Sequence, residues 1–163
     1  AMGGRLDIVV STVGGPQFKP LLMREVQEVR EELDLNFITA FLAVRHGVPL
    51  MEPGGSIVCV SSAAAVQPNF GLAIYAAAKA GIHGFIRDAA FELAEHGVRI
   101  NAVAPGPIDT ERTAPGFEPM RDKDYSPWKL VPMRRIGTLH CALAYLFNTT
   151  VLALLINIGA SLI

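Results

Sequence analysis

The stretch GSIVCVSSAAAVQPNFGLAIYAAAKAG, residues 55–81, decides how this chain folds. Its first part, residues 55–60, is a short apolar run typical of a buried strand in a parallel sheet. Ser62 follows the expected carboxyl end of that strand, where open α/β sheets bind their ligands. Residues 72–96 are then expected to form a helix. The stretch therefore predicts a strand, a ligand-binding turn and a helix in succession.

Tyr75 and Lys79 lie four residues apart in the expected helix and so share one of its faces. Ionising a free tyrosine near neutral pH costs roughly 4 kcal/mol, because its reference pKa is about 10. An ammonium about 4 to 5 Å away returns roughly 3 to 4 kcal/mol at an effective dielectric near 20. Tyr75 is therefore a candidate general acid or base, and Ser62 is a candidate hydrogen-bond donor to the same substrate oxygen.

Residues 56–81, with Ser62 thirteen residues before Tyr75, closely resemble the short-chain dehydrogenase/reductase family. Four further segments match that family in the same order along the chain. They are residues 6–10 (its fourth strand), 34–37 (the helix segment with its asparagine), 98–110 (its sixth strand and the loop beside the nicotinamide) and 135–138 (the turn before its last helix). The resemblance implies an α/β fold with a Rossmann-like parallel sheet.

The resemblance also implies a role for each matching residue. Tyr75 would act as the acid or base, Ser62 would orient the substrate oxygen, and Lys79 would lower the phenol pKa. Asn36 would hold a water that relays protons to Lys79. The implied cofactor is NAD or NADP, and the implied substrate is a small carbonyl or alcohol. Cofactor contacts are expected from Tyr75, Lys79, Pro105, Gly106, Ile108 and Thr110.

The family's glycine-rich turn, which approaches the cofactor pyrophosphate at a helix N-terminus, has no counterpart in this chain. Neither Gly3-Gly4 nor Gly14-Gly15 follows a strand and opens a helix in the required order. Ser11-Thr12-Val13-Gly14 also stands where the family usually carries Asn-Asn-Ala-Gly. We therefore expect a truncated Rossmann-like sheet without the family's first βαβαβ half, forming one catalytic domain over residues 1–163.

Two classes of function follow from these observations. The first is an oxidoreductase that transfers hydride between NAD(P) and a carbonyl or alcohol. The second is a protein that works without the nucleotide, either as an isomerase, lyase or cyclase using Tyr75, Lys79 and Ser62, or as a non-catalytic binding scaffold. The retained motifs favour the first class, and the missing glycine-rich turn favours the second.

Strands alternate with helices along the chain, which predicts a parallel sheet with crossover connections. Residues 107–134 form one irregular, proline-rich stretch, expected to be a lid over the substrate or a cap on the core. The expected strands are residues 6–10, 55–60, 98–103 and 151–158, and the expected helices are 21–48, 72–96 and 138–147.

The composition suits a globular domain: 163 residues, 51% of them hydrophobic, with a net charge of −1. No basic field points to nucleic acid. Cys59 and Cys141 are expected to be buried reduced thiols, which fits a cytoplasmic protein. The histidines lack metal-ligand spacing, so we expect no metal site.

Residues 136–163 contain no Asp, Glu, Lys or Arg and are long enough to span a bilayer. Polar residues interrupt this stretch, however, and the family resemblance divides it into a helix and a strand. We therefore expect no membrane span. The N-terminal residues show no secretory signal, because Asp7 closely follows Arg5.

The expected sheet leaves the edge of the strand at residues 6–10 open to pairing with another chain. The family also packs the helices that correspond to those near Ala40 and Phe91 across a two-fold axis. Both observations predict a homo-oligomer, either a dimer or a tetramer.

Overall fold

The computed structural model of the chain describes residues 4–111, 113, 137 and 138. They belong to two compact units, residues 1–104 and 105–163. The first unit contains β1 (Leu6–Ser11), η1 (Leu21–Met23), α1 (Val26–Leu33), η2 (Asp34–Ile38), α2 (Thr39–Gly47), η3 (Val48–Leu50), β2 (Met51–Val60), η4 (Ala63–Ala65), α3 (Ala73–Ala94) and β3 (Arg99–Val103). The second contains β4 (Ile108–Asp109) and β5 (Gly137–Thr138), which pair in parallel. The single catalytic domain over residues 1–163 stays a prediction.

The sheet of the first unit is parallel throughout, in the order β1-β2-β3. The central strand β2 pairs Val58 with Val10 of β1 on one side and with Asn101 of β3 on the other. Residues 55–59 of β2 are all buried, as the apolar run predicts for a central strand. The predicted α/β, Rossmann-like parallel sheet is thus confirmed.

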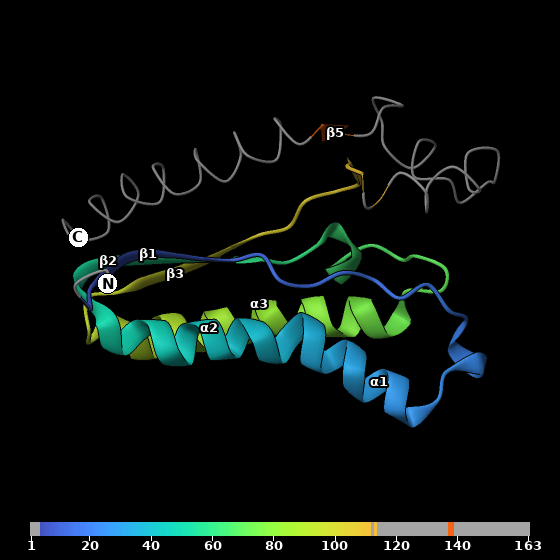
Figure 1. Cartoon of the computed structure of the whole chain (residues 1–163), viewed down its shortest axis with the longest axis horizontal. Coiled ribbons are helices and arrows are strands. Elements are labelled where there is room, and N and C mark those ends of the chain that lie inside the picture. The colour runs from blue at the N-terminus through green and yellow to red at the C-terminus, as the bar shows by residue number, and fades with distance from the viewer. Residues whose placement is uncertain (1–3, 112, 114–136, 139–163) are drawn as a thin grey trace. The chain divides into compact units, whose positions relative to one another are not determined.

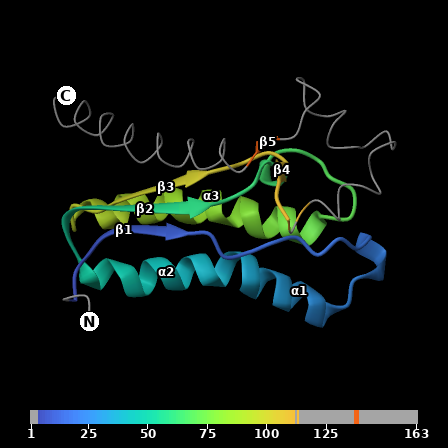
Figure 2. The ribbon, with the colours of Figure 1, turned by 45° about the horizontal axis from the view of Figure 1, so that its top comes forward.

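The three α-helices of this unit lie on one face of the sheet (Figures 1 and 2). Ile57 and Cys59 of β2 meet Ile82 of α3 and Val44 of α2 in a single apolar core between the two layers. Aromatic rings extend this core outward, since Phe37 and Phe41 both make edge contacts with Phe85. This packing fixes α3, the helix that carries Tyr75 and Lys79, against the sheet.

The helix expected from residue 21 begins only at Val26, so the predicted start was wrong. Residues 21–23 form a single 3₁₀ turn, after which Arg24 and Glu25 are extended. The Glu25 and Glu28 side chains each accept a hydrogen bond from the other residue's backbone, forming a capping box that starts the helix at Val26.

The helical region after Leu33 is interrupted by one π turn, η2, which the sequence analysis did not foresee. Thr39 donates its backbone N–H to the Asp34 carbonyl instead of the Leu35 carbonyl, and its hydroxyl donates a hydrogen bond to the Leu35 carbonyl at 2.7 Å. The Asn36 amide also bonds the Glu32 carbonyl at 2.9 Å. Side chains therefore replace regular helical hydrogen bonds around Asn36, and π turns of this kind are frequent at functional sites.

The predicted helix at 138–147 begins wrongly at Thr138, which pairs in β5, and its other residues lie outside the described residues. The predicted strand at 151–158 and most of the predicted lid at 107–134 also lie outside them. Within the part of the chain that is described, no helix is both long and apolar enough to cross a membrane. The cytoplasmic location stays a prediction.

The Cys59 thiol should make the protein less stable at alkaline pH. Burial raises the pKa of this thiol to about 11 from its ordinary value of 9.0. The folded state therefore holds a proton that the unfolded state has lost, and stability should fall by roughly 2 to 3 kcal/mol as pH rises from about 9 to 11. Urea unfolding at a series of pH values measures this loss.

The matched variant is Cys59→Ala, which removes the titrating group. Its absolute stability will differ from that of the wild type, so the comparison uses only the dependence on pH. We expect a shallower alkaline loss in the variant. Parallel curves for the two proteins would show that Cys59 does not titrate as its burial predicts.

Candidate active site

Tyr75 and Lys79 occupy the first two turns of α3, as their spacing predicts. The Lys79 ammonium lies 5.8 Å from the centre of the Tyr75 ring, within the range of a cation–π interaction. Lys79 Nζ also donates a hydrogen bond to the Val60 carbonyl at the end of β2, over 2.9 Å. This bond uses one of the three donors of the ammonium and ties the helix to the carboxyl end of the sheet.

The burial of Lys79 is unusual for a lysine. The residue is only 3% exposed, and none of the ion pairs among the described residues includes it. Burial lowers the pKa of its ammonium, and the neighbouring Cys59 opposes that effect. Buried lysines without a carboxylate partner are rare, and groups perturbed in this way concentrate at functional sites.

Asn36 is fully buried and hydrogen-bonded to the loop that follows β1. Its Oδ1 accepts the Gly15 N–H at 2.8 Å, and its Nδ2 donates to the Gly15 carbonyl at 3.1 Å. These bonds show that Asn36 braces the loop. The predicted relay of protons from Asn36 to Lys79 through a water stays a prediction.

The side chains of Asn36 and Lys79 both lie next to the backbone of Gly14. Gly14 has a φ of +142°, and a Cβ built on it would lie 2.6 Å from Asn36 Oδ1 and 3.0 Å from Lys79 Nζ. Both side chains therefore converge on this glycine, although 43 residues separate them in the sequence (79 − 36). Only a residue without a side chain fits between them.

Replacing Gly14 with alanine should destabilise the protein by about 2 to 4 kcal/mol, because the new methyl group strains the backbone and displaces Asn36 or Lys79. Gly4→Ala is the control, since Gly4 also has a positive φ (+73°) but no atom within 4 Å of an added Cβ. Urea unfolding compares the two variants. Equal losses would mean that the contact at Gly14 contributes nothing beyond backbone strain.

Ser62 lies two residues after the end of β2 and is the N-cap of the short η4 turn. Its Oγ accepts the Ala64 N–H at 3.1 Å. A hydroxyl has one proton to donate and can also accept hydrogen bonds. In the bond with Ala64 the Ser62 oxygen only accepts, so the hydroxyl proton is not used. The proton therefore stays available for a substrate oxygen. Since η4 packs against α3, Ser62 lies at the same end of the sheet as Tyr75.

Ser61 and His83 were missed as site residues by the sequence analysis. The Ser61 hydroxyl donates to the Lys79 carbonyl at 3.0 Å and lies 2.8 Å from His83 Nε2. Because that hydroxyl proton is given to Lys79, His83 Nε2 acts as the donor to Ser61. The available signal was the spacing of Lys79 and His83, four residues apart on one helix face.

The residues expected at the nicotinamide end belong to the second unit. Ile108 lies in β4, and its carbonyl accepts the Thr113 hydroxyl at 2.6 Å. The Thr110 and Thr113 hydroxyls are hydrogen-bonded at 2.9 Å. The contacts of Pro105, Gly106, Ile108 and Thr110 with the cofactor stay predictions. No three potential metal ligands gather among the described residues of either unit.

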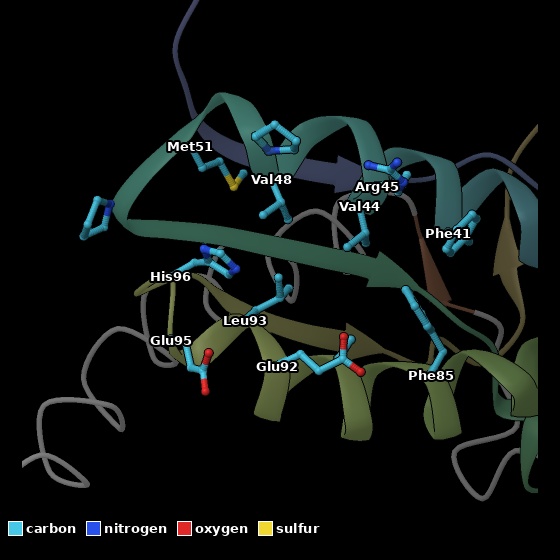
Figure 3. A pocket seen from close by; sticks show the side chains of 13 residues that line it. Phe41, Val44, Arg45, Val48, Met51, Phe85, Glu92, Leu93, Glu95 and His96 are labelled. Atoms are coloured by element: carbon cyan, nitrogen blue, oxygen red, sulfur yellow. The ribbon is translucent and has the colours of Figure 1, made fainter.

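A groove of about 710 Å³ lies between α2, η3 and the second half of α3. Figure 3 shows Val44 and Val48 on one side of it and Leu93 on the other. Met51, at the start of β2, lines this groove, whereas Ser62 and Lys79 lie at the other end of that strand. The groove is therefore separate from the predicted catalytic residues.

Comparison with known proteins agrees with this geometry. The family model described as "short chain dehydrogenase" matches residues 1–120. The NADPH-dependent aldehyde reductase 1 of Arabidopsis thaliana is 34% identical over 147 residues, which is 88% of this chain and 50% of that protein. The chain spans about half the length of the curated relatives it matches.

Two solved structures resemble the fold closely. The structure of gox2181 has a TM-score of 0.83 at 30% identity, over 90% of this chain and 58% of that one. The 7α-hydroxysteroid dehydrogenase complexed with NADH and 7-oxo glycochenodeoxycholic acid has a TM-score of 0.74 at 31% identity, over 83% of this chain and 52% of that one.

Proposed function

Because the chain belongs to the short-chain dehydrogenase/reductase family, we propose that it transfers hydride between NAD(P) and a carbonyl or alcohol substrate. The observation that carries this proposal is the buried Lys79 ammonium beside the Tyr75 ring. No carboxylate among the described residues pairs with this ammonium, and a buried charge without such a partner is unfavourable for folding. A catalytic role explains why the chain retains it.

In the direction of reduction, the Tyr75 hydroxyl gives its proton to the carbonyl oxygen and becomes a phenolate. The nearby Lys79 ammonium stabilises that negative charge. Ser62 donates a second hydrogen bond to the same oxygen, which accumulates negative charge as the carbon is reduced. When bound, NAD(P)H supplies the hydride. The products are the alcohol and the oxidised nucleotide, and solvent returns the proton to Tyr75.

The described residues fit the nicotinamide ribose better than they fit the pyrophosphate. Lys79 and Tyr75 offer an ammonium and a hydroxyl suited to ribose hydroxyls, and we assign the nicotinamide ring to Pro105, Gly106, Ile108 and Thr110. The Gly15 N–H is already bonded to Asn36 Oδ1. The Gly14-Gly15 pair therefore does not serve as a phosphate-binding turn.

Calorimetric titration of the chain with NADH and NADPH tests the proposal. We expect binding at micromolar strength, about −8 kcal/mol, and a loss of at least about tenfold in affinity for Lys79→Met, which removes the charge-assisted contacts. Arg87→Met is the control, because it removes an exposed cation further along the same helix. A folded chain that binds neither nucleotide would overturn the proposal.

A second candidate function is proton transfer without a nucleotide, by Tyr75, Lys79 and Ser62. The bond between Gly15 and Asn36 favours it, because that bond removes the nearest glycine pair from phosphate binding. Isomerisation, elimination and cyclisation need only a proton donor and acceptor at these positions. A nucleotide-free reaction that depends on Tyr75, in a chain that binds neither NADH nor NADPH, would favour this function.

We also propose that two copies of the chain associate through the outer surface of α2 and α3. Ala40 is buried in the core and faces away from any partner, whereas Phe91 is 84% exposed and Phe41 and Leu42 are also exposed. These exposed apolar side chains on α2 and α3 are a suitable contact for a second copy. Sedimentation should give about twice the 17.5 kDa mass of one chain.

The variant Phe91→Asp should lower the sedimentation mass toward that of one chain, because it introduces a charge into the apolar contact. Leu22→Asp is the control, since Leu22 is even more exposed than Phe91 but lies in η1, outside α2 and α3. The edge of β1 is the alternative contact. A wild-type chain that sediments as a monomer contradicts both.

A further inference from the structure

Two loops meet beside the start of α3: residues 12–25, which follow β1, and residues 61–72, which follow β2. Lys19 donates its backbone N–H to the Gly71 carbonyl at 3.0 Å. The rings of Phe18 and Phe70 lie next to this bond, with their centres 6.1 Å apart and their planes at 53°. One backbone hydrogen bond and one aromatic contact therefore join the loops.

Gly71 allows the Phe18 ring to pack closely on the second loop. Its φ is +73°, and a Cβ built on it would lie 3.1 Å from two carbons of the Phe18 ring. The ring thus lies directly against the backbone, where a side chain would displace it. This contact sets the position of Phe18 as well as that of Phe70.

Both rings lie close in sequence to the catalytic residues. Phe70 is five residues before Tyr75, and Phe18 is four residues after Gly14, beside which Lys79 lies. Figures 1 and 2 show the two loops at the end of the sheet to which the strands point, next to the first turn of α3. Ligands of open α/β sheets bind outside that end.

A network of ionic and polar contacts holds the first loop in place. Gln17 donates its backbone N–H to Glu32 Oε1 at 2.9 Å, and the Gln17 carbonyl accepts a hydrogen bond from Arg24 Nη2. On the other side of Phe18, Lys19 Nζ pairs with Glu28 at 2.7 Å. The residues before and after Phe18 are therefore both fixed, so its ring is positioned before any ligand arrives.

The same network neutralises the charges near the two rings. Arg24 is paired with Glu32, and Lys19 is paired with Glu28. Phe18 and Phe70 nevertheless remain 48% and 59% exposed, which leaves two aromatic surfaces in water. Such a surface favours a neutral, apolar group over a charged one.

We propose that Phe18 and Phe70 form a specificity wall that binds an aromatic or bulky apolar substituent on the carbon oxidised or reduced at Tyr75. This inference rests on the proposed function and adds to it the class of substrate: a neutral ketone or secondary alcohol with a large apolar group. The wall selects the substrate and takes no part in proton transfer.

The test measures binding of 2-acetonaphthone to the full chain by ligand-observed NMR. Acetone serves as the probe that has the same carbonyl without the rings. We expect Phe18→Ala and Phe70→Ala to weaken binding of 2-acetonaphthone by about tenfold or more, as losses of apolar contact commonly do in binding pockets. Phe91→Ala removes an exposed phenylalanine at the other end of α3, in the proposed contact between copies, and should leave the affinity for 2-acetonaphthone unchanged.

Phe18→Leu and Phe70→Leu keep apolar bulk and should retain most of the affinity, which separates loss of the wall from loss of the fold. Unchanged binding in both alanine variants would overturn the proposal, as would an equal loss in Phe91→Ala or no binding to the folded wild type. Binding that depends on Phe18 and Phe70 without NADPH oxidation would support the wall and count against the proposed function. NADPH oxidation that both alanine variants leave unchanged would support the proposed function and count against the wall.

Discussion

Replacing Tyr75 with phenylalanine is expected to lower the rate of carbonyl reduction by about a hundredfold to ten-thousandfold, the usual contribution of a positioned general acid. The variant keeps the aromatic ring, so the contact with the Lys79 ammonium persists. It removes only the hydroxyl proton that the carbonyl oxygen receives. The measurement is kcat/KM for reduction of a ketone with NADPH, together with urea unfolding of the same preparation.

The effect on stability separates a catalytic role from a structural one. Loss of one partly buried hydroxyl should change the free energy of unfolding by about 1 kcal/mol or less. Tyr145→Phe is the matched control, because it makes the same chemical change in a tyrosine outside the residues that match the family's motif. A Tyr75→Phe enzyme as fast as the wild type would refute the assignment, whereas a slow enzyme with unchanged stability would support it.

Lys79 should affect the same reaction through charge. Lys79→Met removes the cation that stabilises the phenolate, so the rate of reduction should fall, and the pH at which reduction activity is lost should rise because the phenol keeps its proton longer. The pKa of Lys79 is itself lowered by burial. Its protonated form is therefore less favoured than in water, and the phenolate loses this stabilisation at a lower pH than it would beside an exposed lysine.

The parts of this site that the sequence predicts are those set by local geometry. The spacing of Tyr75 and Lys79 places them on one helix face whatever the rest of the chain does. The apolar run at residues 55–60 likewise identifies a buried strand, and Ser62 lies two residues beyond its end. These predictions need only the periods of a helix and a strand.

The contacts that the sequence analysis missed join residues far apart in the chain. Asn36 bonds Gly15, and Ser61 lies against His83, across 21 and 22 residues respectively. No helical or strand period links such positions, so only the packed fold reveals them. The late start of α1 has a similar cause, because the side chain of Arg24 bonds the loop at Gln17 and pairs with Glu32 while its backbone is extended.

Loss of the ion pair between Arg24, in the loop after β1, and Glu32, in α1, is expected to cause a large change in stability. Both side chains are almost completely buried, and their charged atoms lie 2.8 Å apart. Arg24→Met should destabilise the protein by about 3 to 5 kcal/mol, because it leaves the Glu32 carboxylate buried without its partner. Urea unfolding measures the loss.

The double variant Arg24→Met with Glu32→Leu should recover most of that stability. Although the charges are close, Glu32 Oε2 lacks a well-aligned hydrogen bond. The attraction between the two groups therefore does little more than offset their removal from water, and apolar residues of similar size often replace such a pair without loss. A double-mutant cycle gives the coupling energy directly.

The exposed pair Arg87–Asp88 provides the control, since its side chains are about three-quarters exposed. Removing Arg87 should leave the unfolding curve unchanged, because water screens the charge that remains. Additive losses at Arg24 and Glu32 would instead mean that each contributes through its separate contacts with Gln17. In that case the ion pair would be incidental, and the bonds from both residues to Gln17 would be what holds Phe18 in position.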